Sequence, residues 1–444
     1  MNLVSYSIKT KGTHNFTRRL RTVFTRFGFS EAQTRHTLHT LIETLRQYKA
    51  APTFFIPAVV LRRHPELLAD IVQQGAEVGV HGYVHNDYRT LNKEKQFAQT
   101  QHAISVFEQT HIPYQGFRNP YLGWTEDSLD VFSDLGFAYE SNEAVLHDVI
   151  DVNALSPLIR GGYEKSLALF QAMPCSMYAL RPHFEGSLLR IPTSIPDDEM
   201  LYDRLRITQP EGVGNIWCKV MRNVYEMGGL YTLNLHPERG VLCQRALDTL
   251  LTYAYSRPQP VWMTRLGDIA RWWKERSQFR LTFTQQGEQH WRVEAHCTSR
   301  ATLLARHVTI EDASTVAWSN ADRQVKSTAF TVQATLCPCI ALSPETPRSV
   351  ADFLHEQGYP TVGCLQNEAE FYTLYLDRPE GLGKTRQEQL EQRSKLIDQI
   401  EQLEKPLIRF GCWPNGNRAA LAISGDIDSV TVQDFFLRII EVSR

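Results

Sequence analysis

Near the C-terminal end of the 444-residue sequence, the stretch ALAISGDIDS places Asp426 and Asp428 directly after a run of apolar and small residues. Carboxylates at the carboxyl end of a buried strand are common functional groups in α/β enzymes. Two of them at this spacing can divide the work, one binding a metal ion and one accepting a proton. A structural interpretation also fits, because Asp428 or Ser429 can cap a helix over VTVQDFFLRII.

Two histidines, His81 and His85 in VGVHGYVHND, follow another apolar segment. At this i,i+4 spacing both imidazoles can bind one metal ion if the segment turns helical after Gly82. A third, carboxylate ligand is then needed, and Asp87 is the only obvious acidic candidate beside them in the sequence. The alternative is a pair of polar side chains on a surface loop.

Two further segments carry candidate catalytic groups. In GFRNPYLGW (116–124), Arg118 can hold a carboxylate, and Pro120 stiffens the turn so that the backbone N–H of Tyr121 can face an oxyanion. His236 ends the apolar segment GLYTLNLH and precedes Pro237, which suits a general acid or base. Taken alone, Arg118 and His236 each also have a purely structural interpretation as loop-holding residues.

The elements that must position these residues alternate between strand and helix from about 40 to 275. Strands are predicted at 52–60, 76–82, 115–120, 137–141, 187–192, 229–236 and 260–264. Helices are predicted at 64–75, 126–136 and 242–256, with another between 82 and 110. This regularity indicates a mainly parallel sheet, open or closed into a barrel. Beyond 278 the apolar residues alternate with period two, as in HWRVEAHC (290–297), which indicates an antiparallel β-rich domain.

Composition limits the partners. Lys plus Arg number 47 and Asp plus Glu 49, so the net charge is −2, and it gives no reason to expect nucleic acid or an anionic membrane as a partner. No apolar run of 18 residues predicts a spanning helix, and MNLVSYSIKTKGTHNF shows no signal peptide. We therefore expect a cytoplasmic protein whose eight cysteines are reduced and mostly buried. The oligomeric state is left open.

The candidate residues together resemble the motifs of the polysaccharide deacetylases, the carbohydrate esterase family with a NodB-homology domain. The matching segments are Asp426-Ile427-Asp428, His81 to His85, Arg118-Asn119-Pro120-Tyr121 and Leu233-Asn234-Leu235-His236. The resemblance spans 40–275 and 415–444, and it implies an α/β fold, a distorted (β/α) barrel with an inserted small β-rich domain. The family's first motif comes last here, so the resemblance also implies a circular permutation.

Four regions follow from this interpretation. Residues 1–275 form the main part of the barrel, 278–340 the β-rich domain, and 341–410 an αβ segment with a bridging helix. Residues 411–444 return the first barrel strand, which carries Asp426 and Asp428. If the chain is not permuted, the C-terminal carboxylates are only a helix cap.

The resemblance also implies a division of roles. A divalent metal, with zinc as the expected ion, is bound by His81, His85 and Asp428. Asp426 is the base that activates water, and Arg118 orients it. The Tyr121 backbone N–H helps to hold the oxyanion, and protonated His236 donates to the leaving amine. Asp197 and Asp198 are candidates for tuning His236.

The activity implied is hydrolysis of an N-acetyl group on a sugar or on a polysaccharide precursor, the expected partner being an N-acetylated saccharide. Two alternatives stay open. One is a metal-dependent amidohydrolase acting on a non-sugar or cyclic amide, and the other is a non-catalytic glycan-binding protein on the same fold.

Overall fold

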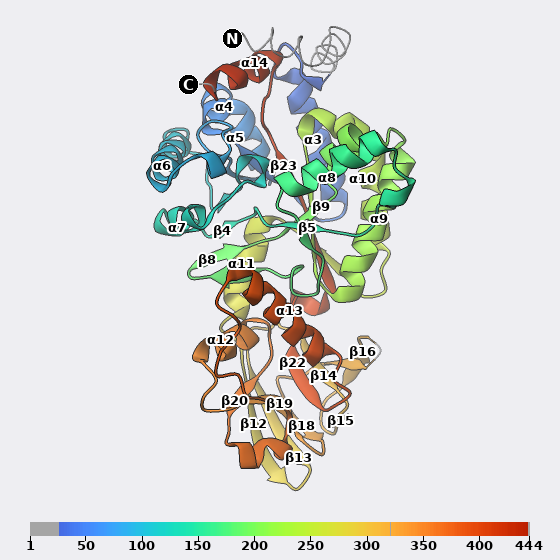
Figure 1. The fold of residues 1–444 in the computed structure, drawn as a ribbon. Helices are drawn as coiled ribbons and strands as arrows, with labels where there is room; N and C mark the ends of the chain where they lie inside the picture. The colour runs from blue at the N-terminus through green and yellow to red at the C-terminus, as the bar shows by residue number, and fades with distance from the viewer. Residues whose placement is uncertain (1–25, 320, 443–444) are drawn as a thin grey trace.

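A computed structural model of the protein describes residues 26–319 and 321–442. The N-terminal stretch on which the signal-peptide prediction rests lies outside these residues. The described chain forms two lobes (Figure 1). The upper lobe is built on one large sheet flanked by helices, and the lower lobe on three small sheets.

Twelve strands form the sheet of the upper lobe, in the order β6-β5-β9-β10-β23-β1-β2-β3-β4-β8-β7, with β11 joined to β23. Neighbouring strands are parallel apart from the β7–β8 hairpin. The strands are β1 (Thr53–Ile56), β2 (Glu77–Val80), β3 (Gly116–Phe117), β4 (Tyr139–Glu140), β5 (Ala144–Leu146), β6 (Met173–Pro174), β7 (His183–Glu185), β8 (Leu188–Arg190), β9 (Thr193–Ile195), β10 (Leu230–Leu235), β11 (Val261–Met263) and β23 (Ala419–Asp426).

The last strand of the chain, β23, lies in the middle of this sheet. It pairs with β1 on one side, with Ser424 opposite Thr53, and with β10 on the other. All eight of its residues are buried. Gly425 permits the close approach of β10, because a Cβ there would lie 2.7 Å from the Leu235 carbonyl oxygen. A strand buried on every side needs small and apolar residues, and the sequence AALAISGD supplies them.

Helix α14 (Val432–Glu441) follows β23, and its N-cap is Thr431. The Thr431 hydroxyl accepts from the Asp434 N–H, and the Asp434 carboxylate accepts from the Thr431 N–H. This reciprocal pairing satisfies the first free N–H groups of the helix. The alternative in which Asp428 or Ser429 caps this helix is therefore wrong, and both residues are left in the loop before it.

The sheet curls on itself. Arg118, just after β3, donates to Thr193 of β9 and to Ser424 of β23, although β9 stands five places from β3 in the sheet. One buried side chain can reach these strands only if the sheet closes most of the way around it. The prediction of an α/β fold with a barrel-like sheet is confirmed.

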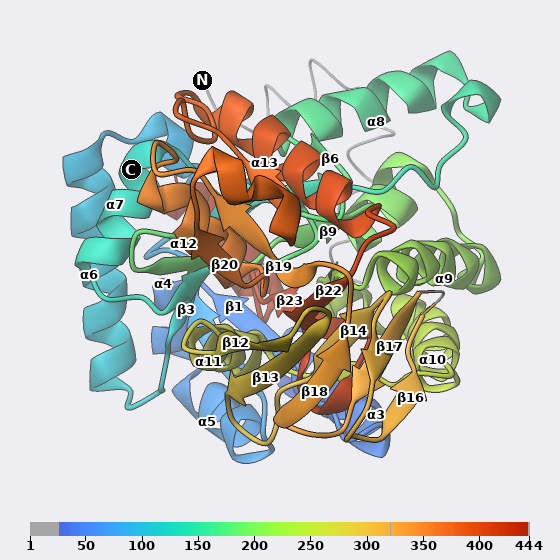
Figure 2. The ribbon, with the colours of Figure 1, turned by 90° about the horizontal axis from the view of Figure 1, so that it is seen from below.

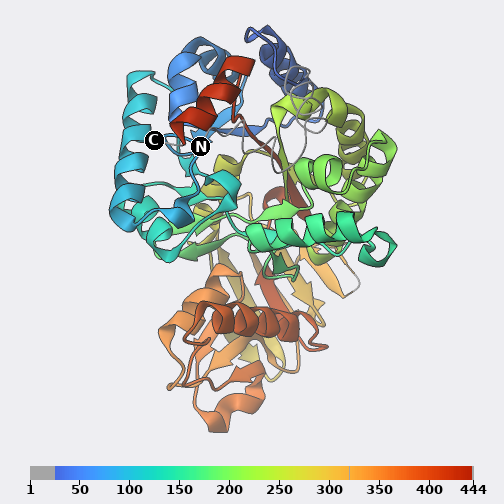
Figure 3. The ribbon, with the colours of Figure 1, turned by 45° about the horizontal axis from the view of Figure 1, so that its top comes forward.

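Helices cover the outside of the curled sheet (Figures 1 and 3). On one side lie α4 (Ala58–Arg63), α5 (Pro65–Gln73), α6 (Lys93–Gln109) and α7 (Glu126–Asp134), and on the other α8 (Pro157–Leu169), α9 (Pro210–Met227) and α10 (Gly240–Tyr255). Helix α3 (Ala32–Gln47) contacts α10, and α11 (Leu266–Arg276) leads to the lower lobe. Apolar side chains under both helix groups form the cores.

The structure corrects one predicted strand and adds elements that the sequence did not reveal. The strand predicted at 52–60 ends at Ile56, and residues 58–63 are helical. Pro57 has no N–H for a ladder and adopts a φ of −60°, which suits the residue before a helix. Strands β5, β6 and β9 have two or three residues each, too few to show a period.

The lower lobe contains two antiparallel sheets and one parallel sheet (Figure 2). The first antiparallel sheet contains β12 (Arg280–Gly287), β13 (His290–His296), β18 (Ala329–Gln333) and β15 (Thr309–Ile310). The second contains β16 (Thr315–Ala317), β17 (Asp322–Val325), β14 (Leu303–Arg306) and β22 (Leu407–Phe410). The parallel sheet contains β20 (Thr361–Gly363), β19 (Cys337–Leu342) and β21 (Tyr372–Leu376). Strand β22 comes from late in the chain and leads directly to the segment before β23.

Helix α13 (Arg386–Glu401) lies across the junction of the lobes (Figure 1). Its Leu396, Ile397 and Ile400 are buried in a cluster with Ile340 of the lower lobe and Tyr178 of the upper lobe. The shorter α12 (Arg348–Glu356) packs into the same cluster. The lobes are therefore joined by an apolar core as well as by the chain itself.

The sequence led to expectations about the cysteines and about membrane-spanning helices. All eight cysteines are free thiols that form no disulfide, and five of them are buried. Among the described helices, none has the length and apolar character needed to cross a bilayer.

Candidate active site

His81, His85 and Asp428 come together at the carboxyl edge of the sheet. His81 follows β2, His85 lies four residues later, and Asp428 follows β23. The Asp428 carboxylate lies 3.5 Å from His81 Nε2 and 3.3 Å from His85 Nε2. One donor atom from each residue falls within 4.8 Å of the others. Two imidazole nitrogens and one carboxylate oxygen are a donor set that suits zinc.

The hydrogen bonds around these three residues leave the ligand atoms free. His81 Nδ1 donates to the Arg118 carbonyl oxygen at 2.8 Å, so its Nε2 carries the lone pair that faces Asp428. A second hydrogen bond of this kind fixes the tautomer of metal-binding histidines. Asp428 Oδ1 is buried without a hydrogen-bond partner among the described residues. An unpaired buried carboxylate oxygen is costly unless a cation approaches it, so these residues fit a divalent ion.

The other oxygen of Asp428 is held by Arg438 of α14. Arg438 Nη1 donates to Asp428 Oδ2 at 2.6 Å. Burial raises the pKa of Asp428, but the charges of His85 and Arg438 outweigh burial and hold it well below its usual range. Asp428 is therefore a carboxylate at neutral pH, the form that binds a metal.

Asp87, the acidic neighbour of the histidines in the sequence, does not join them. Its carboxylate accepts from the Arg89 guanidinium at 2.7 and 2.8 Å and from the Arg89 backbone N–H. It thereby begins the short 3-10 helix Tyr88–Thr90. The carboxylate beside His81 and His85 comes from the C-terminal end of the chain.

Arg118 lies at the centre of the curled sheet and is fully buried. Its Nη1 lies 3.2 Å from Asp426 Oδ1, and it also donates to Asn234 Oδ1 and Ser424 Oγ. Asn234 Nδ2 in turn donates to Asp426 Oδ2 at 3.0 Å. Both Asp426 oxygens are thus held, one by Arg118 just after β3 and one by Asn234 of β10, which fixes the orientation of this carboxylate.

Tyr121 lies beside the histidine cluster. Its ring packs edge-on against His85, with centroids 4.7 Å apart. Its φ of 60° is left-handed, and so is that of Leu122, at 52°. Non-glycine residues in this region carry strain that is most often found at functional loops. The turn predicted from Pro120 is therefore real, and it brings Tyr121 to the edge of the proposed metal site.

His236 follows β10 and is paired with Asp198, which precedes a short π-helical turn, Met200–Arg204. His236 Nδ1 lies 2.6 Å from Asp198 Oδ1, and the His236 backbone N–H donates to Asp198 Oδ2. Burial lowers the pKa of His236, but the charge and hydrogen bond of Asp198 outweigh burial and raise it well above its usual value. Of the two candidates named from the sequence, Asp198 contacts His236. Burial, with the Asp198 charge, raises the pKa of its neighbour Asp197 to about 7.

A mostly apolar cavity of about 310 Å³ opens beside His236. Its walls come from α3, from the end of β10 and from α10, and they include Leu41, Leu235 and Leu247. His236 itself forms part of the wall.

Several residues of this site were not found by sequence reasoning. Asn234 lies within the segment LNLH, in which only His236 was a candidate. Arg438 lies on a helix whose packing partner the sequence does not reveal, so its contact with Asp428 could not be predicted. Ser141 and Thr193, which also accept hydrogen bonds from Arg118, lie on or beside strands of two or three residues. The pairing of β3 with β4 places Ser141 beside Arg118, whereas only the curl of the sheet brings Thr193 to it.

Comparison with known proteins agrees with the motifs. Residues 29–139 match the family model for polysaccharide deacetylase. This segment contains His81, His85, Arg118 and Tyr121, whereas the remaining proposed site residues lie outside it.

The curated relative that this segment resembles is distant. Over 91 residues the chain is 31% identical to a peptidoglycan deacetylase-like protein, FGM2, of Gibberella zeae, a match that covers 20% of this chain. The chain spans about a quarter (27%) of the length of this curated relative.

Solved structures also resemble the chain over about half its length. One is described as a polysaccharide deacetylase from Mycobacterium smegmatis, with 20% identity, a TM-score of 0.42, and coverage of 53% of this chain and 76% of that one. The Puue allantoinase has 19% identity, a TM-score of 0.41, and coverage of 53% and 72%. A CE4 family pseudoenzyme from Bacillus anthracis has 15% identity, a TM-score of 0.35, and coverage of 54% and 62%.

Proposed function

We propose that this protein is a metal-dependent hydrolase that removes an N-acetyl group from an acetylated sugar or a polysaccharide precursor. The observation that carries the proposal is the meeting of four strand ends, after β2, β3, β10 and β23, around His81, Arg118, His236 and Asp428. The family of residues 29–139 supports a deacetylase activity.

We further infer that β23 takes the place of the family's first strand, so that the chain is circularly permuted. The support is its position between β1 and β10. Strand order in space is set by which faces are buried, and a central strand can enter from either end of the chain if a connection reaches it. Here the connection passes through the lower lobe and β22.

The chain's own residues would act as follows. His81, His85 and Asp428 would hold a divalent ion, and such an ion would polarise the acyl carbonyl and lower the pKa of a water molecule. Asp426 is held by Arg118 and Asn234 and accepts a proton from the attacking water.

The remaining residues act on the charge that develops in the reaction. The Tyr121 backbone N–H faces the oxyanion of the tetrahedral state. His236, kept protonated by Asp198, donates to the amine as the C–N bond breaks, since an amine anion is a poor leaving group.

A second candidate function is hydrolysis of a non-sugar amide on the same residues. The cavity beside His236 favours it, because Leu41, Leu235 and Leu247 supply apolar wall next to the polar side chains of Thr40 and Gln244. Such a cavity suits an amide that carries an aliphatic or aromatic group.

One experiment tests both functions. The full chain, supplied with zinc, is assayed for acetate release from N-acetylglucosamine and its oligomers. Parallel assays use cyclic amides and N-acetylated amines that bear apolar groups. Acetate release from the sugars alone supports the first function, and turnover of only the non-sugar amides supports the second. Zinc-loaded protein that hydrolyses none of them while binding the oligomers would instead indicate a non-catalytic glycan-binding protein.

A further inference from the structure

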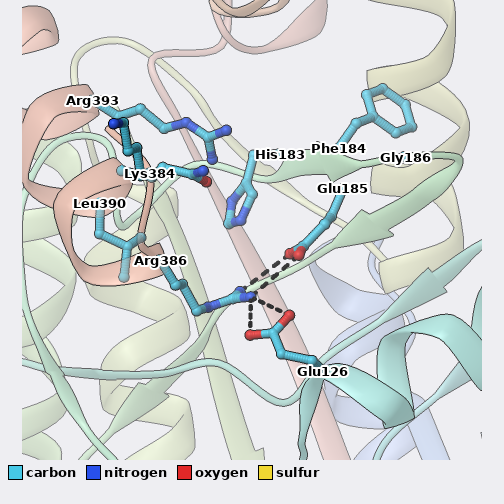
Figure 4. A pocket seen from close by; sticks show the side chains of 10 residues that line it. Glu126, His183, Phe184, Glu185, Gly186, Lys384, Arg386, Leu390 and Arg393 are labelled. Atoms are coloured by element: carbon cyan, nitrogen blue, oxygen red, sulfur yellow. Dashed lines mark hydrogen bonds and ion pairs between the residues drawn. The ribbon is translucent and has the colours of Figure 1, made fainter. Parts of the chain in front are cut away.

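A second cavity, of about 490 Å³, lies at the junction of the lobes. Its walls come from the β7–β8 hairpin, from the first turn of α7 and from α13 (Figure 4). The charged and titratable side chains that line it are Glu126, His183, Glu185, Lys384, Arg386 and Arg393. Cavities of this size hold small ligands in many proteins.

One wall of this junction cavity is balanced in charge. The Arg386 guanidinium contacts the carboxylates of Glu126 and Glu185 at 3.1 to 3.2 Å, as Figure 4 shows. It also reaches Glu143 at 3.0 Å and stacks on Trp124, 4.3 Å from the ring centroid. Arg386 is therefore pinned, and it needs no ligand to satisfy it.

Lys384 and Arg393 add positive charge to the lining. Among the described residues, no carboxylate forms a direct ion pair with either of them, and Arg393 donates to the Tyr178 hydroxyl at 3.0 Å. Arg393 Nε is buried without a partner in the part of the chain that the structure describes. A partly buried guanidinium without a counter-charge is costly, and an anion that enters the cavity would remove this cost.

His183 adds an independent observation. Its side chain is 5% exposed, and its Nδ1 has no hydrogen-bond partner among the described residues. Its Nε2 faces Glu143 at 3.5 Å. In Figure 4 the ring lies between the Arg393 guanidinium and the Arg386 wall, inside the cavity. A buried ring nitrogen without a partner, on a side chain that lines a cavity, indicates a missing hydrogen-bonding group.

We propose that the junction cavity binds a phosphorylated monosaccharide, with its phosphate between Lys384, Arg393 and His183. Guanidinium and ammonium groups at one end suit a phosphate. Glu126 and Glu185, on the side of the cavity away from Arg393, can accept hydrogen bonds from sugar hydroxyls. This inference rests on the chemistry of the cavity alone and does not depend on the proposed deacetylase activity.

The cavity is separated from Arg118 by one short segment, which crosses from β4 to β5. Arg386 holds Glu143 in this segment, Asn142 Oδ1 accepts from the Asn119 N–H at 2.6 Å, and the Ser141 carbonyl accepts from Arg118. A ligand that clamps α13 against the β7–β8 hairpin therefore lies next to residues that also hold the candidate active site.

Calorimetric titration of the full chain with glucose 6-phosphate tests the proposal, because this probe has no amide and cannot be a deacetylase substrate. We expect one site per chain and binding at least about tenfold weaker in Arg393→Gln and in Lys384→Gln, since each removes a charge-assisted contact. Arg393→Lys keeps the charge and should retain most of the affinity. Lys395→Gln, on an exposed part of the same helix, should bind as the wild type does.

Three outcomes would overturn it. These are no binding by the wild type, equal binding by Arg393→Gln, and loss of binding in Asp428→Ala, which would place the phosphate at the histidine cluster instead. Inorganic phosphate that binds as tightly as the sugar phosphate would also contradict the assignment of a saccharide. Thermal unfolding of each variant shows whether it is folded, and the Lys384 variant serves if the more buried Arg393 variants are not.

Discussion

Asp428 Oδ2 lies 3.3 Å from His85 Nε2, although the two residues lie at opposite ends of the described chain. β23, which precedes Asp428, is parallel to β1, and β1 is parallel to β2, which leads to the histidines. Carboxyl ends of parallel strands meet at one edge, so residues that follow β2 and β23 share a site. The proposed metal ligands are brought together by this shared edge.

The first prediction concerns that cluster. Asp428→Ala should abolish stoichiometric zinc binding, because two histidines without a carboxylate leave the ion with too few protein ligands. Asp87→Ala is the matched control, and it should keep about one zinc ion per chain because Asp87 is bonded to Arg89 instead. Metal analysis after mild purification measures both. If Asp428→Ala held zinc as the wild type does, the third ligand would lie elsewhere.

Asp426→Asn should separate metal binding from turnover. Its oxygens are held by Arg118 and Asn234, and none lies in the histidine cluster, so zinc content should not change. Acetate release should fall by a factor of about 100 to 10,000, the usual contribution of a general base. Nearly full activity in this variant would show that another group takes the proton.

Asp198→Asn should change the pH dependence of turnover. Burial lowers the pKa of His236, and the Asp198 carboxylate more than reverses this, so His236 stays protonated through neutral pH. Activity that needs protonated His236 is present below its pKa and is lost as the pH rises through it. Without the carboxylate the pKa falls, so the alkaline loss of kcat should begin at lower pH. An alkaline limb that does not move would exclude His236 as the acid.

Glu401 should stabilise the lower lobe. Burial raises its pKa, but Arg409, Arg181 and Arg306 outweigh burial and lower the value to about 2. Glu401→Gln leaves these guanidinium groups short of a counter-charge and should cost about 3 to 5 kcal/mol of unfolding free energy. Thermal and urea unfolding at neutral pH measure this cost.

Glu401 should also make the free energy of unfolding depend on pH in a defined direction. Because the folded pKa of Glu401 is depressed, its stabilisation is present above its unfolded pKa and is lost as the pH falls toward 2. The difference in unfolding free energy between wild type and Glu401→Gln should therefore shrink between about pH 4.5 and pH 2. Glu391→Gln, exposed on the same helix, should show no such difference.

Much of the site could be predicted from the sequence, because each motif is local. Asp426 and Asp428, His81 and His85, Arg118 and Tyr121 all follow short apolar segments, and an apolar segment that ends in polar residues marks a strand end whatever the strand pairs with. The alternation of such segments with helical patterns also predicted the mixed α/β fold. The family resemblance of residues 29–139 rests on the same local patterns.

The partners of those residues were decided by the tertiary structure alone. Whether Asp428 caps a helix or faces His85 depends on where β23 enters the sheet, and this depends on burial contributed by β1 and β10. Asp198, Asn234 and Arg438 reach their partners across contacts that no local pattern encodes. The sequence by itself determined which side chains stand at strand ends. The curl of the sheet decided which of them meet, because packing free energy comes from segments far apart in the chain.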